Sequence, residues 1–213
     1  MSDTEADLAS LLCSRLCHDL LSPVGAMNNG LELLAEETDP EMRRRCMELL
    51  AESAKAAADK LKFFRLAFGA AGGFGPMVDP GEARALIETM VTSDGRTTLN
   101  WVAGSELAPK AAIKVLLNIV QIVNDALVRG GTVDVGFETR EGVTEIVVRG
   151  EGPRVILDTG IRRVLSGPVA MGEVESRTAA AYMIAELVAS SGGVLQLAEN
   201  EGKDIVIGAM IHH

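Results

Sequence analysis

Two long runs of apolar residues, spaced three or four positions apart, lie between Leu8 and Phe68 of this 213-residue chain. An α-helix has about 3.6 residues per turn, so this spacing places the apolar side chains in one stripe along a helix. The first run predicts a helix over roughly residues 4 to 37. Its stripe contains Leu8, Leu12, Leu16, Leu20, Val24, Met27, Leu31 and Leu34. A helix of this length needs another element to cover its stripe, which restricts this end of the chain to helix packing.

A turn and a second helix follow the first. In EETDPEM, Asp39 is predicted to be an N-cap residue and Pro40 the first helical residue, where its missing N–H costs nothing. The second stripe contains Met42, Cys46, Leu49, Ser53, Ala57, Lys60 or Leu61, Phe64 and Phe68. It ends at GAAGGFG, whose glycines terminate a helix. Residues 1–70 are therefore predicted to form an antiparallel helical hairpin.

A two-helix hairpin alone buries little apolar surface. We expect two copies to pair into a dimeric four-helix bundle, so a homodimer is predicted. Packing of the hairpin on the rest of its own chain stays open as the alternative.

After Pro76 the pattern changes to alternating helices and strands, which predicts a second domain over residues 77–213. Helices are expected over residues 79–93 and 109–131 and near 156–166 and 177–191. Strands are expected over 96–103, 194–200 and 204–211, with a β-hairpin over 132–150 that turns at Glu141-Gly142. The predicted class is α+β: a helical hairpin followed by an α/β sandwich.

The formal net charge of −10 excludes several partners. An acidic surface does not attract nucleic acid or an anionic membrane, so neither is expected to bind. The N-terminal residues lack the basic start and apolar run of a signal peptide, and the apolar stretch 111–128 is interrupted by polar and charged side chains. The three cysteines give no disulfide framework, which is typical of a reducing compartment. We therefore expect a cytoplasmic protein.

His18 interrupts the first helix at a position away from its stripe. At about 100° per residue it lies roughly 160 to 200° from Leu16 and Leu20, so the imidazole is predicted to face away from the core. An imidazole in water is largely neutral near about pH 7 and offers a ring nitrogen as nucleophile. This favours a reactive nucleophile over a packed histidine, with an ordinary solvated helix surface as the alternative.

A metal or haem site is a further alternative, because Cys13 and Cys17 precede His18. Their spacing is not the haem-attachment pattern, and no fourth ligand lies nearby. Cysteines that fill packing positions of the helix are the better interpretation, and no metal site is predicted.

The surroundings of His18 suggest a docking surface for another protein. The predicted docking face consists of Ser14, Leu21, Ser22, Gly25 and Asn29. Pro23 cannot donate a hydrogen bond to the carbonyl of Asp19, so the helix is expected to bend or loosen beside His18.

The second helix is expected to add a basic patch beside this face. If residues whose numbers sum to about 77 lie opposite each other in the hairpin, Lys55 and Lys62 come level with His18. With Arg15 they form a predicted positive patch that could neutralise phosphoryl charge, although solvated lysines are the plainer interpretation.

The segment HDLLSPVGAM, residues 18–27, resembles the phosphoacceptor box of histidine kinase dimerisation domains. The resemblance implies that His18 is the phosphorylated residue. It also implies that Asp19 is the adjacent acid, which in the kinases assists phosphorylation from ATP. The second half is similar to the Bergerat-type ATP-binding domain of those kinases, with NDALVRGGTV where their asparagine box and following strand lie.

The residues that hold ATP in such domains are missing. Gly150 occupies the aspartate position and Arg154 a glycine position of the kinase motif, and Asp125 replaces the magnesium-binding asparagine. Residues 173–191 contain no glycine, so the usual phosphate-covering lid is not expected. A degenerate domain without ATP is predicted, and no cofactor is assigned.

A hairpin that keeps its histidine, fused to such a degenerate domain, resembles the ChpT-type histidine phosphotransferases of the alphaproteobacterial cell-cycle relay. The resemblance implies that a CckA-type hybrid kinase passes phosphate from its receiver aspartate to His18. It implies CtrA- and CpdR-type receivers as acceptors, with magnesium supplied by the receiver. An active histidine kinase core and an adaptor that binds receivers without carrying phosphate are the two alternatives.

Overall fold

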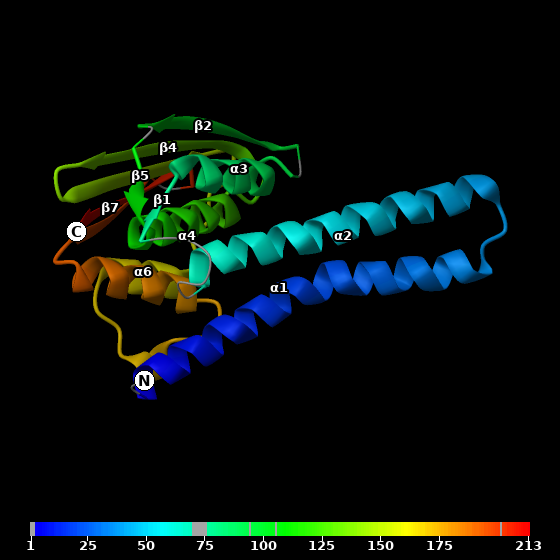
Figure 1. Cartoon of the computed structure of the whole chain (residues 1–213), viewed down its shortest axis with the longest axis horizontal. Coiled ribbons are helices and arrows are strands. Elements are labelled where there is room, and N and C mark those ends of the chain that lie inside the picture. The colour runs from blue at the N-terminus through cyan, green and yellow to red at the C-terminus, as the bar shows by residue number, and fades with distance from the viewer. Residues whose placement is uncertain (1–2, 70–75, 94, 105, 201) are drawn as a thin grey trace.

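The computed structural model describes residues 3–69, 76–93, 95–104, 106–200 and 202–213. Helix α1 (Asp3–Glu36) and helix α2 (Pro40–Phe68) run antiparallel as a long hairpin that projects from the rest of the chain (Figure 1). The Asp39 side chain accepts a hydrogen bond from the Glu41 N–H at 3.1 Å and caps α2, with Pro40 in the first turn. The predicted hairpin and its cap are confirmed.

Small residues let the two helices approach closely. Gly30 of α1 is buried, and a Cβ atom placed there would lie 3.1 Å from Leu50 Cδ2 of α2. The buried positions of α2 include Cys46, Ser53 and Ala57. A larger residue at Gly30 would therefore push the helices apart.

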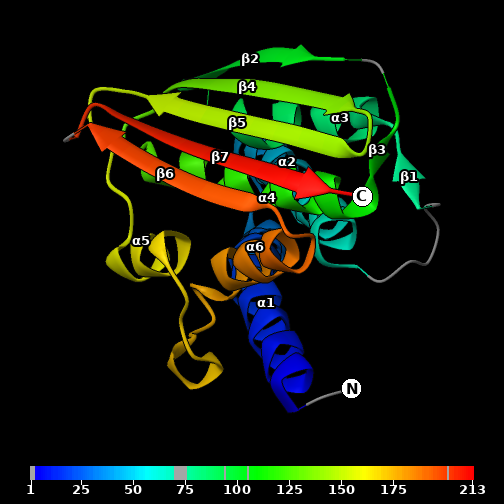
Figure 2. The ribbon, with the colours of Figure 1, turned by 90° about the vertical axis from the view of Figure 1, so that its left-hand side faces the viewer.

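The second part of the chain is a five-stranded sheet with helices on one face (Figure 2). The strand order is β2-β4-β5-β7-β6, and only the β2–β4 pair within this sheet is parallel. The strands are β2 (Thr97–Ala103), β4 (Gly131–Arg140), β5 (Val143–Glu151), β6 (Val194–Asn200) and β7 (Asp204–His212). The helices are α3 (Pro80–Val91), α4 (Lys110–Ala126), α5 (Thr159–Ser166) and α6 (Ala179–Ser190). This α+β arrangement is the one the sequence predicts.

Three short elements were not predicted. Strands β1 (Met77–Val78) and β3 (Ala108–Pro109) pair with each other, and a short 3₁₀ helix spans Met171–Glu173. Pieces of two or three residues are too short to show a period in the sequence.

One hydrophobic core joins the hairpin to the sheet. Helix α4 is buried on almost every side, and Phe63, Phe64 and Leu66 from the end of α2 belong to the same core as Leu116 and Val120 of α4. The end of the hairpin therefore packs on its own chain, while its outer length projects. The predicted linker between the two parts lies mostly at residues 70–75, outside the described residues. No helix in the described ranges is long and apolar enough to span a membrane.

Candidate functional site

His18 lies on the outer surface of α1, with 85% of its side-chain surface exposed. The predicted orientation is confirmed: the imidazole faces solvent. Its Nδ1 atom lies 3.2 Å from Oδ1 of Asp19. A carboxylate oxygen at this position accepts a hydrogen bond from Nδ1–H, which leaves the lone pair of Nε2 free. The ring therefore presents Nε2 as its nucleophilic atom.

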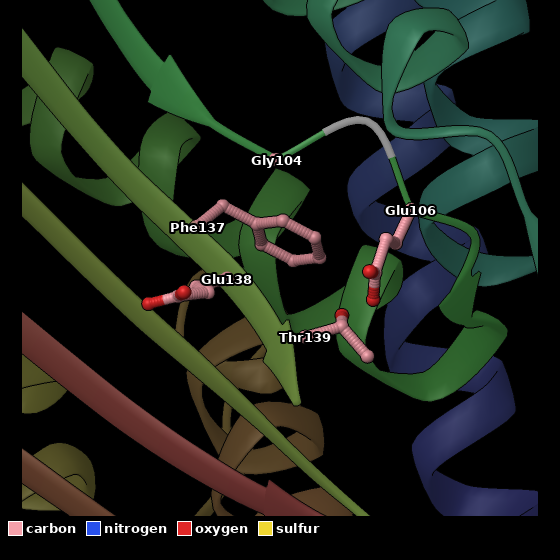
Figure 3. Close-up of a pocket in the computed structure, with 5 residues that line it drawn as sticks. All are labelled: Gly104, Glu106, Phe137, Glu138 and Thr139. Atoms are coloured by element: carbon pink, nitrogen blue, oxygen red, sulfur yellow. The ribbon is translucent and has the colours of Figure 1, made fainter. Parts of the chain in front are cut away.

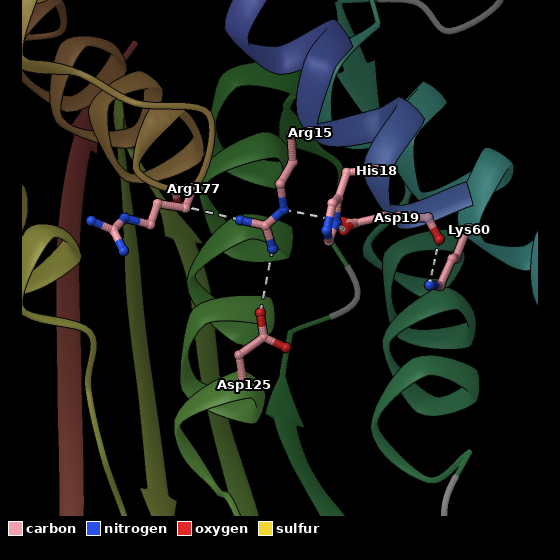
Figure 4. Close-up of polar contacts among 6 residues, drawn as sticks. All are labelled: Arg15, His18, Asp19, Lys60, Asp125 and Arg177. Carbon is pink, nitrogen blue, oxygen red and sulfur yellow. Dashed lines mark hydrogen bonds and ion pairs between the residues drawn. The ribbon is translucent and has the colours of Figure 1, made fainter. Parts of the chain in front are cut away.

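Arg15 holds the other carboxylate oxygen of Asp19. Its Nε donates to Oδ2 at 3.1 Å, and the guanidinium also reaches Asp125 Oδ2 at 3.5 Å and the Arg177 carbonyl at 3.3 Å (Figure 4). Only 19% of the Arg15 side chain is exposed. The structure thus places Arg15 between α1 and the α/β part, behind Asp19. The predicted grouping of Arg15 with Lys55 and Lys62 in a positive patch stays a prediction.

Asp125 is the partner of Arg15 on α4. The surrounding chain displaces water and raises the pKa of Asp125 to about 6, Arg15 acts in the opposite direction, and the Asp19 carboxylate adds a further upward contribution. Solvent still reaches the side chain, which is 56% exposed. Asp125 thus forms part of an ion-paired contact with α1.

Lys55 and Lys62 lie exposed on α2, each paired with Asp59. Lys55 Nζ is 2.9 Å from Asp59 Oδ2, and Lys62 Nζ is 3.2 Å from Oδ1. These bonds lower the pKa of Asp59, the Lys55 hydrogen bond most strongly. The two lysines and Asp59 together carry one net positive charge on the hairpin surface.

Lys60 is a residue that the sequence predictions missed. Its Nζ donates to the backbone carbonyl of Asp19 at 2.8 Å, across the hairpin (Figure 4). The sequence contained one signal for this contact: Pro23 leaves that carbonyl without its helical donor. The sequence periodicity instead suggested that Lys60 or Leu61 belongs to the apolar stripe of the second helix.

The predicted docking face lies beside His18 on α1. Ser14, Ser22 and Asn29 are exposed, and Leu21 is 69% exposed. Gly25 is half-buried, and a Cβ atom there would meet no atom within 4 Å. This face is accessible along α1.

The prediction that the cysteines fill packing positions is wrong for Cys13 and Cys17, which are exposed. Each lies on a part of α1 that α2 does not cover, because a helix in a two-helix hairpin packs on one side only. Cys46 of α2 is buried as predicted. Within the described residues, no group of three or more histidine, cysteine, aspartate or glutamate side chains could hold a metal ion.

Gly150, which the sequence resemblance places at the aspartate position of the kinase motif, is enclosed by packed side chains. A Cβ atom at Gly150 would lie 2.6 Å from Val123 Cγ1 and 3.4 Å from Leu127 Cδ2. No aspartate side chain fits at this position without displacing the core. A separate hollow of about 230 Å³ lies at the end of β4 and is lined by Gly104, Glu106, Phe137, Glu138 and Thr139 (Figure 3). None of the predicted site residues lines it.

Comparison with known proteins gives the class of this chain. A family model described as the histidine phosphotransferase C-terminal domain matches residues 80–203. Protein phosphotransferase ChpT of Brucella abortus (strain 2308) is 35% identical over 203 residues, which are 95% of each chain. A solved bacterial phosphotransferase is 33% identical, covers 98% of this chain and 97% of its own, and superposes with a TM-score of 0.83.

The chain is a histidine phosphotransferase. It belongs to the ChpT family, whose members are protein phosphotransferases of two-component signalling.

Proposed function

We propose that His18 is the residue that carries the phosphoryl group. The observation that supports this most directly is its exposed ring, whose Nδ1 is engaged by Asp19 at 3.2 Å while Nε2 is free. Nε2 attacks the phosphorus of an aspartyl phosphate in line: the N–P bond forms as the P–O bond to the donor aspartate breaks, which returns that aspartate as a carboxylate. The acceptor aspartate reverses the same step.

Asp19 and the docking face support the transfer in different ways. The Nδ1 proton stays on the ring, so the phosphorylated imidazole carries a positive charge that the Asp19 carboxylate neutralises. The docking face of Ser14, Leu21, Ser22, Gly25 and Asn29 positions the receiver, and Lys55 and Lys62 attract its acidic surface. The donor is the receiver of a CckA-type hybrid kinase, and the acceptors are CtrA- and CpdR-type receivers.

The chain takes its phosphate from a partner and not from ATP. The filled space at Gly150 supports this, because the aspartate that reads adenine in the kinases has no room there. Magnesium belongs to the bound receiver, whose aspartyl phosphate it serves, and no cofactor is assigned to this chain.

The working unit is a homodimer. Stripe residues of both helices stay exposed in the single chain, among them Val24, Leu31, Met42, Leu49 and Leu61. Burial of such a seam against a second copy stabilises the pair at about 25 cal/mol per Å² of apolar surface. A dimeric four-helix bundle covers it.

Phosphate transfer from an isolated receiver tests the proposal. The protein is mixed with a receiver domain that carries radiolabelled aspartyl phosphate, and acid-labile label is expected on the wild type and not on His18→Gln. Label that persists on His18→Gln would place the phosphate elsewhere.

The same preparation separates the two rival functions. Self-labelling from labelled ATP alone would indicate a histidine kinase. Receiver binding without any label on the chain would indicate an adaptor. The expected result is no label from ATP and rapid label from the phosphorylated receiver.

A further inference from the structure

Helix α1 lacks one backbone hydrogen bond beside the phosphoacceptor. Pro23 has no N–H, so the carbonyl of Asp19, four residues earlier, has no helical donor. Pro23 is buried in the hairpin. A carbonyl left without a partner in a partly buried position costs about 1 to 3 kcal/mol, so another donor is needed there.

Lys60 of α2 supplies that donor. Its Nζ lies 2.8 Å from the Asp19 carbonyl oxygen, in a partly buried bond that joins residues 41 positions apart. The bond involves a charged donor, which makes it stronger than the amide bond it replaces. Lys55 and Lys62 of the same helix instead pair with Asp59. Among these three lysines, Lys60 alone reaches across the hairpin to α1.

Asp19 is thereby held at three separate atoms. Its carbonyl accepts from Lys60 at 2.8 Å, its Oδ2 accepts from Arg15 at 3.1 Å, and its Oδ1 lies 3.2 Å from His18 Nδ1. The bond from Lys60 fixes the backbone of Asp19, and the bond from Arg15 fixes its carboxylate. Because the carboxylate contacts Nδ1 of His18, its position sets the orientation of the imidazole.

We propose that Lys60 is a positioning residue for phosphotransfer, which acts by filling the hydrogen bond that Pro23 removes. Lys60 does not touch the imidazole, and it sets where Asp19 holds the ring. This inference rests on the proposed role of His18. Pro23 removes a hydrogen bond from α1, and Lys60 of α2 replaces it. A substitution at either residue is therefore expected to have a different effect when the other is also changed.

A double-mutant cycle between Lys60 and Pro23 tests the proposal. Lys60→Met keeps an unbranched side chain close to the length of the lysine stem and removes the donor. Pro23→Ala restores an N–H that bonds the Asp19 carbonyl within the helix. Lys60→Met is expected to slow the bound-state transfer rate about tenfold, since small errors in the position of a nucleophile have effects of this order. The dissociation constant for the receiver is expected to change less than about twofold.

The decisive measurement is whether Pro23→Ala reduces the effect of Lys60→Met on the transfer rate. In the Pro23→Ala background, Lys60→Met is expected to cost less than about threefold, because the new N–H already satisfies the carbonyl. Lys60→Arg keeps a charged donor and is expected to retain most of the rate. Lys203→Met, which removes an exposed lysine from the β6–β7 turn, is the charge-matched control and is expected to leave the rate unchanged.

Nuclear magnetic resonance of the His18 ring gives a readout that needs no receiver. Nitrogen-15 spectra of the imidazole report which nitrogen carries the proton. Lys60→Met is expected to increase the share of the Nε2-protonated form, and Pro23→Ala is expected to reverse that increase in the double variant. Circular dichroism on each variant confirms that the hairpin is folded.

The outcomes separate the two proposals. If wild-type protein takes no phosphate at His18, the proposed function itself is wrong. If the wild type transfers phosphate and Lys60→Met does so equally fast, the inference about Lys60 is wrong. A loss from Lys60→Met that is equally large with and without the Pro23→Ala substitution would also overturn it, because Lys60 would then act by a route other than the Asp19 carbonyl.

Discussion

At the scale of single residues, the site depends on Asp19 and on what holds it. The carboxylate contacts His18 and Arg15, and the carbonyl contacts Lys60. Arg15 also forms an ion pair with Asp125 of α4. His18 is thus connected by polar contacts to both the second hairpin helix and the α/β part.

Asp125→Asn is expected to flatten the pH dependence of stability. The folded pKa of Asp125 is raised to about 6 from 3.8, mainly because the surrounding chain displaces part of its hydration water, so the folded chain binds more protons than the unfolded chain between these values. The contribution of Asp125 to stability is therefore largest below its unfolded pKa and falls as the pH rises to about 6. Urea unfolding from about pH 4 to about pH 7 measures this, and the wild type is expected to lose more stability than the variant as the pH rises. An identical pH profile would contradict the assignment.

Gly150→Asp is expected to destabilise the fold without creating an ATP site. The new side chain would enter apolar packing against Val123 and Leu127. A buried, unpaired carboxyl and the displaced core together cost about 3 kcal/mol or more in unfolding free energy. Gly136→Ala on the neighbouring strand β4, whose nearest contact would be 3.7 Å away, is the control and is expected to change stability little. ATP binding by a stable Gly150→Asp variant would show that the pocket survives.

At the scale of elements, α1 carries two glycines with opposite surroundings. Gly30 packs against Leu50 of α2, whereas Gly25 has open space around it on the docking face. Gly30 allows close packing of the two hairpin helices, and Gly25 leaves no side chain protruding from the surface of α1 at its position.

Gly25→Ala is therefore expected to separate folding from docking. Alanine in a helix interior is about 0.5 to 1 kcal/mol more favourable than glycine, so urea unfolding should show a more stable hairpin. The added methyl group raises the docking face, and receiver affinity measured by calorimetry is expected to fall. Gly30→Leu is the contrasting variant: it should destabilise the hairpin, because its side chain meets Leu50. A Gly25→Ala variant that is less stable than the wild type would contradict the open surroundings of Gly25.

The longer helices and the five strands of the main sheet were predictable from sequence, the three short elements were not, and the contacts of the site were predictable only in part. Apolar spacing determined α1 and α2, and the helical wheel correctly placed His18 in solvent, because both depend on neighbours in the same helix. The contact of Lys60 with Asp19 and that of Arg15 with Asp125 join different elements. Such contacts depend on how the helices pack, which the period of one helix does not contain.

At the scale of the whole molecule, the projecting hairpin leaves an apolar seam exposed. Leu31 and Leu49 are 56% and 41% exposed, on α1 and α2 respectively. Seams of this kind are costly in water, and association of two copies removes them.

Leu31→Glu with Leu49→Glu is expected to produce a monomer. Two carboxylates per chain, buried at the centre of the proposed bundle, would each lose hydration without gaining a partner. Light scattering coupled to size-exclusion chromatography measures the mass, and the wild type is expected at twice the mass of the variant. Val102→Glu, on an exposed position of β2, should stay dimeric. A wild-type monomer at micromolar concentration would contradict the dimer.

The core shared by the end of α2 and helix α4 has a mechanical consequence. Because Phe63 and Phe64 are anchored in the same core as Leu116, the sheet cannot swing freely about the rod, and the two parts tumble as one piece. A receiver that binds at the proposed docking face would therefore meet the α/β part at a fixed position relative to the imidazole, which limits its approach angles. We expect selection among receivers to depend on the shape of their surfaces, because no closing movement of this protein is needed.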